Sequence, residues 1–112
     1  MQFSEAQPVE GYGAGFFRIN GQRFEGGILV TVNGIQPWAG YEDSESLLAL
    51  QGEVDVIFIG TGVEIAHLPA PLRVQIEKAG MGVEVMASPS ACRTYNVLAA
   101  EGRRVALAAL PV

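Results

Sequence analysis

The sequence predicts an α/β fold of an α+β-like, three-layer kind, in which an antiparallel amino-terminal meander joins a β-α-β-α-β unit and helices pack on a mixed central sheet. The meander is predicted because Asn-Gly pairs at residues 20–21 and 33–34 separate short runs of apolar residues. The β-α-β-α-β unit is predicted because strand-like apolar runs alternate with helix-like segments from residue 54 onward.

The length of 112 residues fits one domain, since domains run to roughly 100–200 residues. Residues 1–14 show no periodicity and contain Pro8, Gly11 and Gly13, which predicts an irregular lead-in. Residues 15–112 are predicted to form a single globular α/β domain.

The first predicted hairpin turns at Asn20-Gly21, because a two-residue Asn-Gly loop favours the type I′ turn with positive φ at both positions. Glycines at 26–27 break the chain before the strand-like run at residues 28–32. The second Asn-Gly pair ends that strand, so the first third of the chain is predicted to be one antiparallel meander.

A helix is predicted from Ser44 to Gln51, capped by Asp43 or Ser44 and stopped by Gly52. The following run at residues 54–59 is apolar on both faces, which is typical of a central strand covered on both sides.

A shorter helix is predicted from about Pro71 to Ala79, followed by a strand over 82–86. Ser88 is predicted to be the N-cap of the last helix, with Pro89 at its first position, and Gly102 ends it. The chain finishes in the fully apolar run VALAAL at residues 105–110, a predicted strand.

The composition limits the classes of function. A net charge of −5 argues against non-specific nucleic-acid binding, which depends on Lys and Arg. No apolar run approaches the roughly 18 residues that a membrane span needs, and the first 15 residues lack a secretory pattern, so we expect a cytoplasmic protein without membrane insertion. The 49% hydrophobic content indicates a sheet covered on both faces, self-association or an apolar docking surface.

The turn Gly60-Thr61-Gly62 invites comparison with a nucleotide-binding loop. A dinucleotide fingerprint needs a third glycine, but Ile65 occupies that position, and prolines at 69 and 71 delay the next helix. No Gly-Lys-Ser/Thr of a P-loop follows. We therefore interpret the turn as a strand exit.

No residue set is typical of catalysis or of metal binding, and no cofactor is predicted. His67, the single histidine, has only Glu64 as a potential neighbouring ligand. Cys92 lies inside a helix among alanines, which favours a packed thiol over a nucleophile. No serine occupies a Gly-x-Ser-x-Gly elbow.

Two sets of polar residues remain as candidates for binding a ligand or partner. Arg93, Arg103 and Arg104 fall within 12 positions of an acidic chain, and arginine suits carboxylate or phosphate, although surface pairing also explains them. The second set would surround a pocket where the Gly60–Gly62 turn meets the Ser88 helix: Thr61, Arg93, Thr94, Tyr95 and Asn96. Structural roles for Thr94, Tyr95 and Asn96 are the alternative.

The stretches VDVIFIGTG, GVEVM and ACRTYNVLAAEGRRVALAALPV resemble a small single-domain family over residues 14–112. This family includes the mitochondrial respiratory complex I assembly factor three and uncharacterised bacterial and archaeal proteins. The resemblance implies a three-layer α/β fold, no established enzymatic activity, and action through protein–protein contacts in eukaryotic relatives. The absence of an Arg- and Ser-rich presequence indicates a bacterial-type member.

Two hypotheses of function follow. In the first, the protein is a non-catalytic interaction module that helps the assembly or biogenesis of a membrane complex through a protein partner. In the second, it binds a small molecule or anion, or is an unrecognised enzyme, with a pocket beside Gly60–Gly62. A weaker third idea is a homo-oligomer formed by strand pairing through VALAAL or the hairpin edges.

Overall fold

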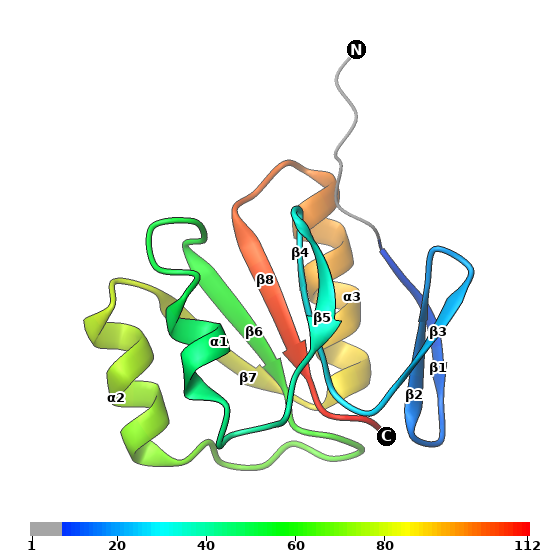
Figure 1. The fold of residues 1–112 in the computed structure, drawn as a ribbon, viewed down its shortest axis with the longest axis horizontal. Coiled ribbons are helices and arrows are strands. Elements are labelled where there is room, and N and C mark those ends of the chain that lie inside the picture. The colour runs from blue at the N-terminus through cyan, green and yellow to red at the C-terminus, as the bar shows by residue number, and fades with distance from the viewer. Residues whose placement is uncertain (1–7) are drawn as a thin grey trace.

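The computed structural model describes residues 8–112, which form eight strands and three helices (Figure 1). In chain order these are β1 (Val9–Gly13), β2 (Phe16–Ile19), β3 (Gln22–Glu25), β4 (Ile28–Thr31), β5 (Gly34–Pro37), α1 (Ser44–Leu48), β6 (Val56–Gly60), α2 (Ala70–Lys78), β7 (Gly82–Met86), α3 (Ser88–Ala100) and β8 (Val105–Ala109). Strands β1-β2-β3 form a small antiparallel sheet, and the other five form the main sheet in the order β5-β4-β8-β6-β7.

The small sheet confirms the predicted hairpin and corrects the predicted lead-in. Asn20 and Gly21 have φ values of 52° and 75°, as a type I′ turn requires. Residues 9–13, expected to be irregular, form β1 because they pair with β2 and because the Asn96 side chain holds Val9. Residues 1–7 of the predicted lead-in lie outside the described residues.

The single predicted meander is wrong, because its strands are divided between two sheets. The chain turns at Gly26, whose φ is 78°, and β4 leaves β3 to pair with β5 and with β8. The reason lies in β4 itself, because Leu29 and its neighbours Ile28 and Val30 are buried on opposite faces and need cover on both sides.

Strand β8 lies in the centre of the main sheet, antiparallel to β4 and parallel to β6. All five of its residues are buried. Both of its edges are already paired, so the expectation that VALAAL pairs between chains is wrong for this strand. Among the described residues, the outer strands of the main sheet are β5 and β7.

The main sheet is the middle of three layers, as predicted (Figure 1). Helix α3 and the small sheet cover one face, where Phe17, Phe58, Tyr95 and Leu107 share one apolar cluster. Helices α1 and α2 cover the other face, where Leu47, Ile57 and Ile76 belong to a second cluster.

The helix boundaries follow the predictions with two corrections. Helix α1 ends at Leu48 and continues as turns, so it is shorter than predicted, while Asp43 caps it by accepting from the Ser46 amide at 3.2 Å. Ser88 is the first residue of α3 and not its N-cap. Its hydroxyl forms tertiary hydrogen bonds with Gly62 and Leu110 instead of bonding to an amide of the helix.

Candidate functional site

The site predicted from the sequence lies where β6 ends and α3 begins, and one hydroxyl group holds this junction together. Ser88 is fully buried, and its Oγ donates to the Leu110 carbonyl at 2.6 Å and accepts from the Gly62 amide at 2.9 Å. A Cβ on Gly60 would come 2.8 Å from the Ser88 Cα, so only glycine allows this approach. The junction joins the end of β6, the start of α3 and the segment after β8.

The backbone groups of the glycine turn are engaged within the protein. The Thr61 amide donates to the Met86 carbonyl at 2.9 Å, and the Gly62 carbonyl accepts from the Ser88 amide at 2.8 Å. A phosphate cradle requires backbone amides directed at the ligand. The amides of Thr61 and Gly62 instead fix the exit of β6 against β7 and α3.

The Thr61 side chain orders the loop that follows β6. Its Oγ1 donates to the Glu64 carbonyl at 2.7 Å and accepts from the Ala66 amide at 3.0 Å. Three hydrogen bonds therefore hold the loop, two of them within it and one from the Gly62 amide to Ser88 of α3. Its two β-branched apolar residues point outward, with Val63 70% exposed and Ile65 67% exposed.

A cavity of about 210 Å³ adjoins this loop. It is lined by Ile65, Ala66, His67, Leu68, Arg73 and Val85, so it joins the loop to α2 and to β7. Strand β7 is the last strand of the main sheet on this side.

The outer edge of β7 has open backbone groups. The Gly82 amide and the Met86 carbonyl are bonded on the β6 side, at 2.8 and 2.9 Å. Because successive residues of a strand alternate in direction, the N–H and C=O groups of Val83 and Val85 face outward. We call Val63, Ile65, the cavity that Ile65 lines and this edge the loop–edge surface.

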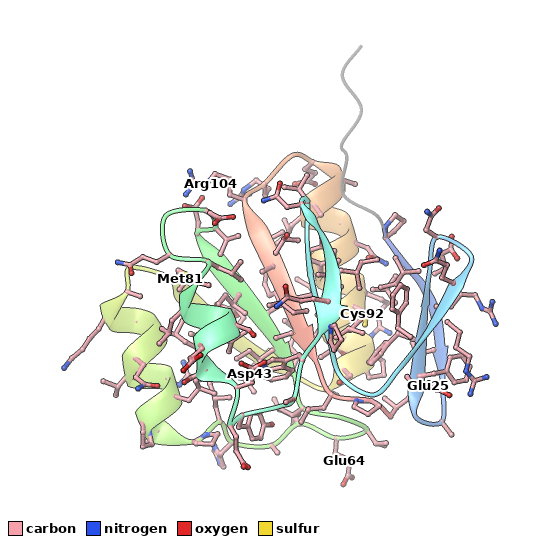
Figure 2. All side chains as sticks on the ribbon, in the orientation of Figure 1. Glu25, Asp43, Glu64, Met81, Cys92 and Arg104 are labelled. Atoms are coloured by element: carbon pink, nitrogen blue, oxygen red, sulfur yellow. The ribbon has the colours of Figure 1, made fainter. Side chains whose placement is uncertain are left out.

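The three arginines do not converge. Arg93 is in the second turn of α3, and Arg103 and Arg104 follow its other end, about 15 Å further along the helix. Arg104 pairs with Asp55 at 3.4 Å and also donates to the Gly52 carbonyl at 3.1 Å. Figure 2 shows Arg104 and Glu64 at opposite ends of the molecule, so the arginines at residues 103–104 are remote from the loop–edge surface.

The three consecutive polar residues of α3 face different surroundings. Asn96 binds both the amide and the carbonyl of Val9, at 2.9 and 3.0 Å, and thereby attaches β1 to the helix. Thr94 donates weakly to the Met86 sulfur at 3.6 Å. Tyr95 is buried in the core, which agrees with the alternative of a structural role, but its hydroxyl has no hydrogen-bond partner in the part of the chain described.

Cys92 is a packed core thiol, as its helical position predicted. Its side chain is 3% exposed, and burial raises its pKa to about 11, with a smaller opposing effect from the Arg93 charge. Burial also raises the pKa of Tyr95 to about 12. Neither group provides an anion for nucleophilic chemistry near neutral pH.

These two pKa values predict that the protein loses stability in alkaline solution. The unfolded chain releases the Cys92 proton near pH 9 and the Tyr95 proton near pH 10, whereas the folded protein holds both until about pH 11 and about pH 12. Since the unfolded state then binds fewer protons, the free energy of unfolding falls as pH rises above about 9. Urea unfolding between pH 7 and 10.5 should show this fall, and it should be smaller in Cys92→Ala/Tyr95→Phe. An equal fall in both proteins would contradict this prediction.

One groove in the structure was not predicted from the sequence. It measures about 510 Å³ and lies between the β4–β5 hairpin and α1, with Glu45 and Glu53 among its lining residues. No local pattern indicates this groove, because its walls come from segments that the fold brings together.

The described residues contain no group of three or more His, Cys, Asp or Glu side chains arranged to hold a metal ion. Within residues 8–112, no helix is long and apolar enough to cross a membrane.

The fold and the sequence together define a family. Residues 9–110 match the DUF498/DUF598 family of proteins of unknown function, and the chain belongs to this family. It is 48% identical over 110 residues to an uncharacterised protein of Rhodobacter capsulatus, covering 98% of this chain and 89% of that one.

The family also includes eukaryotic assembly factors. The chain is 30% identical over 115 residues to human NADH dehydrogenase [ubiquinone] 1 alpha subcomplex assembly factor 3, covering 96% of this chain and 62% of that protein. It therefore spans about three fifths of the length of that relative. A crystal structure of a Bartonella henselae protein described as an outer membrane protein has a TM-score of 0.88 and 34% identity, covering 99% of both chains.

Proposed function

We infer that this protein is a non-catalytic interaction module that assists the assembly of a membrane-associated complex. The observation that carries this proposal is the loop–edge surface, where two strongly exposed β-branched side chains stand on a loop held by two internal hydrogen bonds and by one to Ser88 of α3. A preformed apolar projection loses little conformational freedom on binding, so it is suited to docking a protein partner.

The open edge of β7 specifies the kind of partner that fits. An extended segment can add to this edge through the backbone groups of Val83 and Val85. An apolar side chain of that segment would then enter the cavity beside Ile65 and Val85. The proposed partner is therefore a protein with an extended apolar segment.

Similarity to the human assembly factor supports a partner that belongs to a membrane complex. By this similarity we propose a subunit of a respiratory NADH dehydrogenase, met on its cytoplasmic side. Deletion of the gene should lower the amount of assembled NADH dehydrogenase measured on native gels, and re-expression of the wild-type chain should restore it. Normal assembly in the deletion strain would exclude this complex as the target.

The double variant Val63→Asp/Ile65→Asp tests the surface itself. Both side chains are exposed, so the melting temperature should stay within about 2 °C of wild type, because such surface changes alter stability by about 0.5 kcal/mol. The tagged chain is cross-linked in cells of the source organism, and its partners are quantified by mass spectrometry. Recovery of the partner should fall at least tenfold, because two charges would enter an apolar contact.

Val97→Asp is the matched control, since Val97 is 58% exposed on α3 and outside this surface. This control should recover the same partner in wild-type amounts. Equal recovery with the double variant, or loss with Val97→Asp alone, would contradict docking at the loop–edge surface.

A further inference from the structure

The two outer strands of the main sheet, β5 and β7, offer different backbone edges. In β5, the Trp38 amide bonds to the Gly27 carbonyl, so by alternation the backbone groups of Ile35 and Pro37 face away from β4. Proline has no N–H, so this edge lacks a donor that an added strand would use. The outward residues of β7 are two valines, each with an N–H and a C=O. An added strand therefore fits β7 better than β5.

Glu84 lies between these two valines, and its side chain is on the other face of the sheet. Its Cα partner on β6 is Phe58, which belongs to the apolar cluster under α3, whereas Val83 and Val85 pack with the cluster under α1 and α2. Glu84 is exposed, and it forms no ion pair or side-chain hydrogen bond with any residue between 8 and 112. Its carboxylate is therefore available to a charge from outside the chain.

A strand added to β7 brings one of its residues opposite Glu84. In an antiparallel pair, Val83 and Val85 exchange hydrogen bonds with the incoming strand, so Glu84 takes part in a non-hydrogen-bonded pair with Cα atoms about 4.5 Å apart. A cation opposite the carboxylate stabilises such a pair, and a like charge destabilises it. The residues before and after that cation lie on the opposite face. The one beside Val85 meets the cavity, where Arg73 disfavours a second cation and Ile65 suits an apolar side chain.

We propose that Glu84 selects the segment that β7 receives, which is an extended segment of a partner protein with Lys or Arg flanked on both sides by apolar residues. This inference rests on the proposed function, because it specifies the partner of the loop–edge surface. The same carboxylate disfavours a second copy of this chain. Antiparallel self-pairing that uses both outward valines would place Glu84 opposite its own equivalent, with two like charges in contact.

Two short peptides, Thr-Val-Lys-Val-Thr and Thr-Val-Glu-Val-Thr with both ends blocked, test this selection by ¹⁵N-resolved NMR. Both should shift the amides of Val83 and Val85. The lysine peptide should bind about fivefold more tightly, which is the difference between an opposite-charge and a like-charge pair. The preference should reverse in Glu84→Lys, and in the wild type it should shrink in about 1 M NaCl, where the Debye length is about 3 Å.

Glu45→Lys is the matched control, because Glu45 is also exposed but lines the groove beside the opposite outer strand, β5. It changes the net charge equally and should keep the wild-type preference. The inference is overturned if neither peptide shifts the two amides at about 5 mM, if both bind equally, or if Glu45→Lys reverses the preference. A wild-type dimer in which the amides of Val83 and Val85 are protected from exchange would also overturn it.

Recovery of the cellular partner separates this inference from the proposed function. Glu84→Lys should lower that recovery, as Val63→Asp/Ile65→Asp does. If only the double variant lowers it, docking at the loop–edge surface stands and selection by Glu84 is wrong. If neither variant lowers it, docking at this surface is itself wrong.

Discussion

Gly60→Ala should destabilise the protein by about 3 kcal/mol, a large effect for the addition of one methyl group. The new Cβ would lie 2.6 Å from Ser88 Oγ and 2.8 Å from Ser88 Cα, closer than such atoms approach in proteins. Relief requires the start of α3 to move away from β6, because the second contact is with backbone. For a chain of this size the melting temperature should fall by about 10–20 °C.

Gly11→Ala is the matched control for this prediction. Gly11 lies in β1, and a Cβ there would meet no atom within 4 Å, so the same added methyl group meets no steric barrier. Both variants lower the conformational entropy of the unfolded chain by replacing a glycine. The difference between their melting temperatures therefore reports the packing effect at Gly60. A melting temperature of Gly60→Ala within 3 °C of wild type would show that α3 is not held against β6 as described.

The features that could be predicted from the sequence are those decided by neighbours in the chain. The Asn20-Gly21 turn is one, because positive φ at two adjacent residues is a local property of those residue types. The Asp43 cap is another, since its carboxylate reaches an amide only three residues away. The three-layer architecture also followed, because runs that are apolar on both faces require cover on both faces.

The features that could not be predicted depend on segments brought together by folding. The central place of β8 is decided by its pairing with β4 and β6, and its apolar sequence is equally compatible with an edge that associates between chains. The arginines of residues 93–104 are close in the chain, yet the length of α3 separates them. The unpaired Tyr95 hydroxyl has no signal in the sequence, because helical periodicity identifies a buried tyrosine but not what surrounds its oxygen.

The role of the glycine turn also depends on contacts that only the folded chain makes. The sequence Gly60-Thr61-Gly62 alone suggests backbone groups that could bind a ligand. In the folded chain, Gly60 gives α3 room to approach, and Thr61 and Gly62 hold the loop that presents Val63 and Ile65. The polar candidates at this junction thus support an apolar surface, which is why the proposed function concerns a protein partner.

Ser88→Ala should destabilise the protein by about 2–4 kcal/mol, because it removes two tertiary hydrogen bonds. Loss of a serine that only capped the helix would cost about 1 kcal/mol. Removal of the hydroxyl takes a hydrogen bond from the buried Gly62 amide and another from the part-buried Leu110 carbonyl, which are 26 and 22 residues away in the chain. Ser90→Ala, two residues further along α3, removes a hydroxyl that, among residues 8–112, is bonded only to the exposed Arg93, and it should change stability by less than about 0.5 kcal/mol. Urea unfolding measures both.

Ser88→Asp distinguishes the tertiary role of this serine from a capping role. An aspartate is as good an N-cap as a serine, so a capping role predicts little change. In the structure, the carboxylate would be buried against the Leu110 carbonyl, which accepts a hydrogen bond from Ser88 and has no hydrogen to donate to a carboxylate. We therefore expect Ser88→Asp to be less stable than Ser88→Ala, with faster hydrogen exchange at the amides of residues 61–66. A variant as stable as wild type would show that Ser88 is a cap, and that the loop carrying Val63 and Ile65 is not fixed through its hydroxyl.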